Sequence, residues 1–329
     1  MEIGPDPASR FAHPLSADEL ESIVYHGLGP TDPVVGATEV GLGMYNNVYR
    51  VDLRSGTRVA VRVAPPAAEQ FRSEAQLMRN EHATTPWLTP ISNLTARVLA
   101  TDWTGTIVER DWMISEWLPG TPTPDAWESL DTHMRQDFFR QLGAVTRRIH
   151  DIPGPHFGTV HGPHFDRWSD AFLHSILAIV EDLRHSGCHY SDLEEIAELA
   201  DARRGMLDRT DGARLLTGDL WTVNTLIDPG PGPTISGIVD LDRTLWGDPL
   251  ADWTIYMALA KSGTERDAFF DAAAYGSIPR DGEYSVRQML YKARHIGAVR
   301  LEGLRLANGE TVRSSIDRMS EVFSSLRDG

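Results

Sequence analysis

The 329-residue chain has a single cysteine, Cys188, and its only lysines among 31 basic residues are Lys261 and Lys292. A lone cysteine cannot form an intrachain disulfide, and no apolar run approaches the roughly 20 residues that a membrane-spanning helix needs. The first residues, Met1–Pro7, lack the basic and apolar regions of a signal peptide. We therefore expect a cytoplasmic protein that does not have a membrane as its partner.

Basic residues are also outnumbered, because 47 acidic side chains give the chain a formal net charge of −16. Nucleic acids and anionic membranes repel a strongly acidic surface, so neither is an expected partner. Two interpretations of this excess of acidic residues stay open: a solvated surface that aids solubility, or an acidic cleft that attracts a cationic substrate. Nothing in the sequence indicates an obligate protein partner.

The residue pattern changes twice along the chain. Residues 34–63 show strand-like stretches broken by glycines, with a hairpin turn at Arg54–Thr57, and Pro65-Pro66 then opens an expected helix that includes Phe71 and His82. Prolines crowd the segment Pro119–Pro124, which favours a linker, and the pattern beyond it is mainly helical. We therefore predict an α+β chain with a small sheet-containing lobe at residues 1–118 and a larger helical lobe at residues 119–329.

One short region carries the side chains that phosphoryl transfer requires. Asp219 precedes Asn224 by five residues, and Asp240 follows a short apolar strand. In phosphoryl transfer one carboxylate accepts the proton of the attacking hydroxyl, while an amide and a second carboxylate hold Mg²⁺ against the nucleotide phosphates. The spacing predicts that Asp219 is the base and that Asn224 and Asp240 bind the metal.

Four earlier segments come in the order that such a site needs. Gly41 and Gly43 lie between two strands, where backbone N–H groups can approach phosphates, although a simple glycine hairpin is an alternative. Arg62 ends the next strand with a cation suited to phosphates, and Glu74 on the following helix is placed to pair with it; each is otherwise a surface residue. The segment Glu116–Leu118 ends an apolar strand before the linker, where backbone groups are available to adenine.

Together with Gly247–Asp252, these segments resemble the aminoglycoside phosphotransferase family from about Thr38 to Leu259. The resemblance implies a bilobal protein-kinase-like fold, with a small antiparallel-sheet N-lobe, a larger mainly helical C-lobe, and ATP and Mg²⁺ as cofactors. Asn46 replaces the third glycine of a protein-kinase phosphate loop, which suits this family. The family's functional positions fall on Asp219 for catalysis, on Asn224 and Asp240 for metal, and on Gly41, Gly43, Asn46, Arg62, Glu74, Glu116 and Leu118 for the nucleotide.

Thr217 is the main departure from the family pattern, because the position two residues before the catalytic Asp219 usually holds histidine. That histidine braces the catalytic loop and does not take the proton. We therefore expect its loss to remove a brace and to change loop geometry more than the chemical step.

The acceptor is expected to be a small molecule that carries a hydroxyl group. Only seven residues separate Asp240 from Asp248, and no Ala-Pro-Glu segment follows, so a protein-kinase activation loop has no room. Analogy with the family indicates ATP-dependent O-phosphorylation of an antibiotic, which confers resistance by inactivation. The alternatives are a metabolic sugar or amino-alcohol kinase and a nucleotide-binding pseudokinase.

Overall fold

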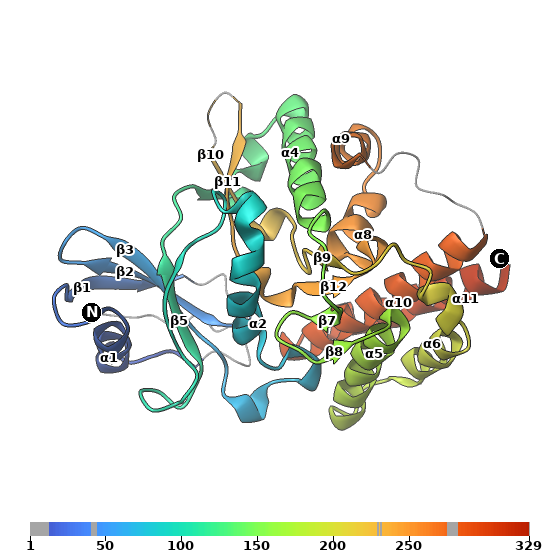
Figure 1. The fold of residues 1–329 in the computed structure, drawn as a ribbon, viewed down its shortest axis with the longest axis horizontal. Helices are drawn as coiled ribbons and strands as arrows, with labels where there is room; N and C mark the ends of the chain where they lie inside the picture. The colour runs from blue at the N-terminus through green and yellow to red at the C-terminus, as the bar shows by residue number, and fades with distance from the viewer. Residues whose placement is uncertain (1–12, 41–44, 229, 231, 275–281, 329) are drawn as a thin grey trace. The chain divides into compact units, whose positions relative to one another are not determined.

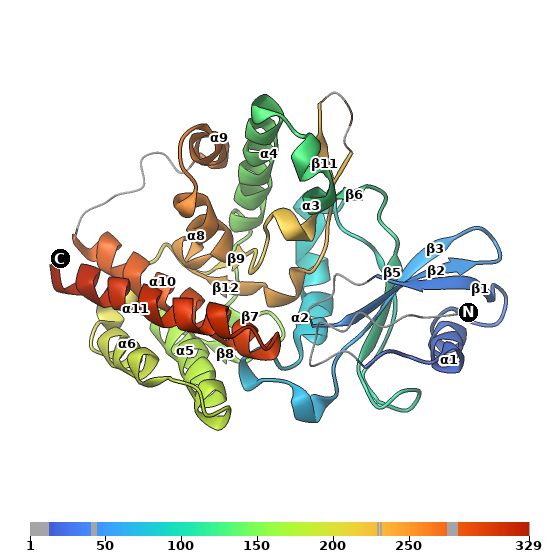
Figure 2. The ribbon, with the colours of Figure 1, turned by 180° about the vertical axis from the view of Figure 1, so that it is seen from behind.

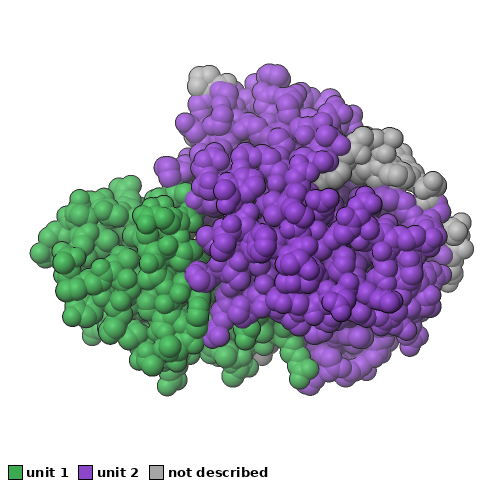
Figure 3. Space-filling view, viewed as in Figure 1, with its two compact units in different colours: residues 1–78, 96–118, 304–308 green, residues 79–95, 119–303, 309–329 purple. Residues whose placement is uncertain are grey.

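A computed structural model describes residues 13–40, 45–228, 230, 232–274 and 282–328 (Figure 1). The chain forms two compact units, which Figure 3 distinguishes by colour. The first contains residues 1–78, 96–118 and 304–308, and the second contains residues 79–95, 119–303 and 309–329. None of the helices within the described residues is both long and apolar enough to cross a membrane.

The first unit is built on a five-stranded antiparallel sheet with the strand order β1-β2-β3-β5-β4. Alternate side chains of β2 are buried, including Tyr49 and Val51, so one face of the sheet covers an apolar core. The turn between β2 and β3 is the predicted hairpin, with Gly56 at a φ of 88°. The strands are β1 (Val34–Glu39), β2 (Asn47–Leu53), β3 (Arg58–Val63), β4 (Val98–Asp102) and β5 (Trp112–Glu116).

Helix α1 (Ala17–Leu28) begins at a capping box and supplies apolar side chains to the same core. The Ser16 hydroxyl accepts a hydrogen bond from the Glu19 N–H at 3.3 Å, and the Glu19 carboxylate accepts one from the Ser16 N–H at 2.8 Å. The buried residues Leu20, Ile23 and Val24 recur at helical spacing on one face. Local sequence therefore specifies both the start of this helix and the face that it buries.

The prediction of one continuous helix after Pro65-Pro66 is wrong. The segment forms two short 3₁₀ turns, η1 (Ala67–Glu69) and η2 (Arg72–Glu74), and the regular helix α2 (Leu77–Thr84) starts only later. Gln76 lies in the left-handed region at a φ of 61°, which no α-helix can include. Glu74 consequently lies in a 3₁₀ turn and not on a helix.

Helices make up most of the second unit, and their packing forms its apolar core around Phe138, Phe139 and Trp246. Helices α10 and α11 run side by side in both views (Figures 1 and 2). The helices are α3 (Thr123–Ala126), α4 (Thr132–His150), α5 (Trp168–His185), α6 (Ser191–Asp201), α7 (Arg204–Leu207), α8 (Trp253–Ala260), α9 (Thr264–Ala273), α10 (Gly282–Arg305) and α11 (Gly309–Asp328), with 3₁₀ turns η3 (Thr85–Ile91), η4 (Trp127–Ser129), η5 (Thr222–Asn224), η6 (Leu241–Arg243) and η7 (Pro249–Ala251).

Two small antiparallel sheets hold the loops that carry the predicted catalytic residues. In the first, β10 starts directly after Asn224, β11 ends shortly before Asp240, and their pairing joins Thr225 to Ile238. In the second, β9 leads into the segment that contains Asp219, while β12 leads into the Asp248–Asp252 segment. The strand orders are β11-β10-β6 and β8-β7-β12-β9, with β6 (Thr121–Pro122), β7 (Phe157–Thr159), β8 (His164–Phe165), β9 (Arg214–Leu216), β10 (Thr225–Asp228), β11 (Thr234–Ile238) and β12 (Leu245–Gly247).

Candidate active site

The catalytic run, residues Leu216–Asn224, turns sharply as it leaves β9. Gly218 adopts a φ of 77°, and a Cβ atom at this position would come within 2.1 Å of the Arg243 carbonyl oxygen. Only glycine fits such a close backbone approach at this conformation. The turn sends the chain through Asp219 to Asn224, whose side-chain Nδ2 donates to the Asp219 carbonyl oxygen at 2.8 Å. The amide nitrogen of Asn224 is thus used within the loop, and its carbonyl oxygen is the end suited to a cation.

Asp240 is brought to the same place by the β10–β11 pair. The N–H of Val239 donates to the carbonyl oxygen of Asn224 at 3.0 Å, so the residues before Asp240 are tied to the end of the catalytic run. Asp240 itself adopts φ 60° and ψ 50°, a left-handed conformation that non-glycine residues seldom take. Such strain persists where surrounding structure imposes it and is common at functional sites. The structure thus brings Asp219, Asn224 and Asp240 together within the second unit.

Arg243 was not predicted as a site residue, yet its guanidinium Nε lies 3.9 Å from Asp219 Oδ2. Burial raises the pKa of Asp219 to about 7; Arg243 opposes the rise, while Asp240, Glu302 and Asp252 add to it. The side chain still exposes 37% of its surface, so solvent reaches the carboxylate. A carboxylate with a pKa near neutral suits a general base. Arg243 ends the η6 turn that follows Asp240, and nothing in the sequence indicated this turn, so the contact with Asp219 was not predicted.

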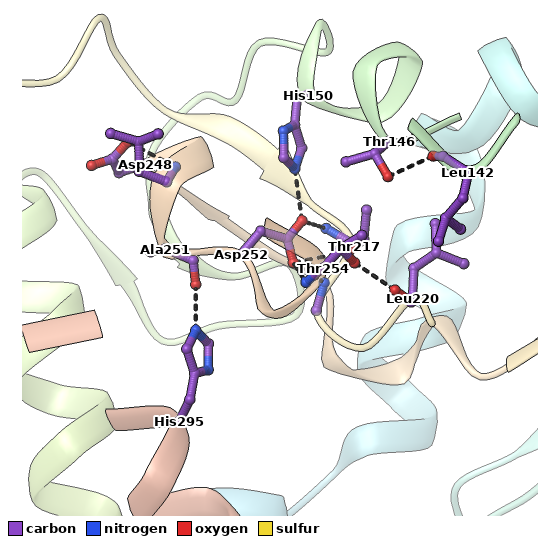
Figure 4. Close-up of polar contacts among 12 residues, drawn as sticks. Leu142, Thr146, His150, Thr217, Leu220, Asp248, Ala251, Asp252, Thr254 and His295 are labelled. Atoms are coloured by element: carbon purple, nitrogen blue, oxygen red, sulfur yellow. Dashed lines mark hydrogen bonds and ion pairs between the residues drawn. The ribbon is translucent and has the colours of Figure 1, made fainter. Parts of the chain in front are cut away.

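A second carboxylate, Asp252, is buried beneath the catalytic run and accepts hydrogen bonds from several directions (Figure 4). His150 Nε2 donates to it at 2.7 Å, and the N–H and hydroxyl of Thr217 donate at 2.7 and 2.9 Å. The N–H of Gly218 adds a contact at 3.2 Å. Burial alone would raise the pKa of Asp252, but the His150 and Thr217 interactions hold it below its ordinary value.

The expectation that position 217 has lost a brace is therefore wrong. Thr217 is fully buried, and besides its bond to Asp252 its hydroxyl oxygen lies 2.6 Å from that of Thr254. Thr254, also fully buried, donates to the carbonyl oxygen of Leu220, the residue after Asp219, at 2.6 Å. Figure 4 shows this set of contacts meeting at Asp252. Thr217 thus ties the backbone before Asp219 to Asp252, and Thr254, whose N–H donates to the same carboxylate at 3.4 Å, ties the backbone after it.

The predicted nucleotide contacts lie in the first unit. Arg62 is on β3 and 8% exposed, and Asn46 is 6% exposed with an Oδ1 atom that has no hydrogen-bond partner among the described residues. A buried amide oxygen without a partner is uncommon in a folded protein and fits a position that a ligand completes. Gly41 and Gly43 lie outside the described residues.

Glu74 and Glu116 have partners that the sequence did not predict. Glu74 is buried and forms an ion pair with Arg305, and its predicted pairing with Arg62 stays a prediction. The Glu116 carboxylate pairs with Arg97 at 2.8 Å, and its N–H donates to the Arg97 carbonyl oxygen. This N–H is used within the first unit, and the contacts of Glu116 and Leu118 with the nucleotide stay a prediction.

Solved structures of aminoglycoside phosphotransferases share this fold. APH(4)-Ia is 16% identical, with 94% of this chain and 99% of that chain covered and a TM-score of 0.66. A thermostable mutant of APH(4)-Ia, in a ternary complex with AMP-PNP and hygromycin B, is 15% identical, with 94% and 99% covered and a TM-score of 0.65. APH(2")-IIIa in complex with GDP and kanamycin is 16% identical, with 92% and 97% covered and a TM-score of 0.64. At these identities the likeness concerns the fold, which is kinase-like.

A search of curated proteins gave no match. By contrast, the sequence model of the phosphotransferase enzyme family matches residues 36–287, well over half of the chain. The match runs from within β1 to beyond β12 and includes the catalytic run, so it spans every residue predicted for the site. The chain therefore belongs to the phosphotransferase enzyme family.

Proposed function

We propose that this phosphotransferase transfers the γ-phosphate of ATP to a hydroxyl group of a small molecule, with Asp219 as the general base. The observation that carries the proposal is the local assembly of Asp219, Asn224 and Asp240 by the Asn224–Asp219 and Val239–Asn224 hydrogen bonds. Asp219 then accepts the hydroxyl proton and orients the oxygen for attack on phosphorus. Arg243, 3.9 Å away, balances the charge of the base.

Asn224 and Asp240 are the residues that would hold Mg²⁺. An amide oxygen and a carboxylate are ligands that Mg²⁺ accepts, and the strained backbone of Asp240 fits a residue held for such a task. When bound, the ion neutralises charge on the nucleotide phosphates. Arg62 would add a positive charge for the same phosphates, and Asn46 an amide oxygen for a donor on the nucleotide.

For the acceptor we propose a hydroxylated antibiotic, which phosphorylation inactivates. The structures of relatives with kanamycin and with hygromycin B support this substrate class, since the fold is shared. The segment after Asp240 also supports a small acceptor, because η6 and β12 occupy it from Leu241 to Gly247. A metabolic sugar or amino-alcohol kinase with the same catalytic residues is the second candidate.

The test is ATP consumption with a panel of hydroxylated antibiotics, sugars and amino alcohols, with mass spectrometry to detect the added phosphate. Asp219→Asn should lower kcat by about 10²–10⁴-fold, because the base is lost. Asp228→Asn is a matched control, since Asp228 is an exposed carboxylate at the end of β10. Near-full turnover by Asp219→Asn would exclude Asp219 as the base.

The same pair of variants tests the resistance role in a sensitive bacterium. Protection by the wild type and by Asp228→Asn, but not by Asp219→Asn, supports an antibiotic acceptor. A panel in which only sugars or amino alcohols gain phosphate points to the metabolic kinase. For a cationic acceptor, added salt should lower kcat/KM, because the net charge of −16 attracts it at low ionic strength.

A further inference from the structure

Arg305, the last residue of α10, is a buried cation for which the sequence predicted no role. Its side chain is 4% exposed, although arginine is almost never fully buried without a partner. Residues 304–308 pack with the first unit, while the preceding residues of α10 belong to the second. The charge of Arg305 is therefore placed inside the unit that contains the predicted nucleotide contacts.

Arg305, Glu74 and Tyr45 form a set of three residues that contact one another. Its Nη1 atom donates to Glu74 Oε1 at 2.5 Å, and its guanidinium carbon lies 5.5 Å from the centre of the Tyr45 ring. Tyr45 completes the set, because its hydroxyl donates to the carbonyl oxygen of Glu74 at 2.7 Å. A planar guanidinium combines a directed carboxylate bond with stacking on an aromatic face, which the ammonium group of lysine cannot do.

Glu74 needs an anchor from elsewhere in the chain because its own element is short. It ends the three-residue turn η2, and the left-handed residue Gln76 follows two positions later. Three residues of 3₁₀ backbone do not fix a side chain as a packed helix does. Tyr45 is likewise the residue directly before Asn46, whose buried amide oxygen has no partner among the described residues. Arg305 thus contacts two segments that both carry predicted nucleotide contacts.

We propose that Arg305 is a positioning residue for nucleotide binding, which acts by fixing the Glu74 carboxylate and the Tyr45 ring. This inference rests on the proposed function, because it assigns Glu74 and the segment at Asn46 to the nucleotide site. Arg305 does not itself touch the reacting atoms. Its loss is expected to weaken nucleotide binding and to leave acceptor binding unchanged.

The chain offers a matched control on the same helix. Arg300 is fully buried and donates to both carboxylate oxygens of Asp192, at 2.8 and 2.7 Å, and to the His189 carbonyl oxygen. None of these partners is a predicted site residue. The double variant Arg300→Met/Asp192→Asn removes a buried ion pair from α10 without touching Glu74 or Tyr45.

The experiment compares Arg305→Met and Arg305→Lys with wild type and with the Arg300→Met/Asp192→Asn control. We expect Arg305→Met to raise the Kd for magnesium AMP-PNP and the KM for ATP about 10-fold, with the acceptor KM unchanged. Arg305→Lys should raise both nucleotide constants about 3-fold, because lysine keeps the positive charge but lacks the planar set of N–H donors and the stacking on Tyr45. The control should lower the melting temperature without changing either nucleotide constant.

Arg305→Lys keeps the test decisive if Arg305→Met does not fold. Wild-type nucleotide constants in Arg305→Lys, or in a folded Arg305→Met, would overturn the proposal. So would an equal change in the Arg300→Met/Asp192→Asn control, since the effect would then follow from lost stability. A wild-type protein that neither binds AMP-PNP nor transfers phosphate contradicts the proposed function itself. Normal wild-type binding with unaffected Arg305 variants contradicts only the role of Arg305.

Discussion

Thr217→Val removes the hydroxyl that links the catalytic run to Asp252 and changes little else in shape. The lost bond is a 2.9 Å contact to a fully buried carboxylate, and hydrogen bonds to charged groups contribute about 1.5–3 kcal/mol. Asp252 keeps His150 and the backbone N–H of Thr217 as donors, so its charge is not left unpaired. We therefore expect the free energy of unfolding to fall by about 2 kcal/mol.

The catalytic consequence follows from the position of the bond, two residues before Asp219. A displacement of about 1 Å in a catalytic group costs up to about 10²-fold in rate, so a smaller shift should lower kcat about 10-fold. KM for ATP should change little. Urea denaturation gives the stability, and coupled ATP consumption gives kcat.

Thr217→Ser is the control, since it keeps the hydroxyl and should retain most of the rate. Thr217→His, which restores the residue usual in the family, should lower stability, because position 217 is fully buried and an imidazole overpacks it. A Thr217→Val protein with wild-type stability and kcat would refute the reasoning, because backbone donors alone would then suffice for Asp252.

Three further substitutions test other parts of the second unit. Asp240→Ala should abolish magnesium-dependent turnover, because the ion loses its main anionic ligand, and a magnesium titration measures this. Arg243→Gln should lower kcat about 10-fold at unchanged KM for ATP, since Asp219 loses its neighbouring cation; Arg243→Lys should restore part of the rate. Burial lowers the pKa of His295 to about 3, so the folded state resists a proton that the unfolded chain takes up below pH 6.5. As the pH falls from about 7 to 5, this difference in proton uptake lowers the free energy of unfolding by about 2 kcal/mol. His295→Gln should remove most of this pH dependence, which denaturation curves recorded at several pH values would measure.

The parts of the fold that the sequence predicted are those set by local patterns. The β2–β3 hairpin follows from alternating apolar residues around Gly56, and α1 follows from its capping box. The segment after Pro65-Pro66 was mispredicted because its apolar spacing suits a helix, while the left-handed Gln76 breaks it. Nothing in a glutamine side chain signals that conformation, so packing decides it.

The site shows the same division between local and distant information. The spacing of Asp219, Asn224 and Asp240 was readable because short strands tie these positions to one another. The contact of Arg305 with Glu74 could not be read from the sequence, because the two residues lie 231 positions apart and meet only when a long helix packs in the folded chain. Thr254 was missed for a similar reason, since only the folded chain places its hydroxyl against that of Thr217.

The pseudokinase alternative would rest on Thr217, which stands where the family usually has histidine, but Thr217 itself contacts Asp252. What the catalytic run requires from position 217 is a donor to Asp252, and a threonine hydroxyl supplies it at 2.9 Å. The same carboxylate is held by His150, so an imidazole reaches it from α4 as well. Asp252, which accepts these hydrogen bonds, is present and buried. The sequence change at Thr217 therefore alters the chemistry of the brace while the loop that carries Asp219 stays anchored.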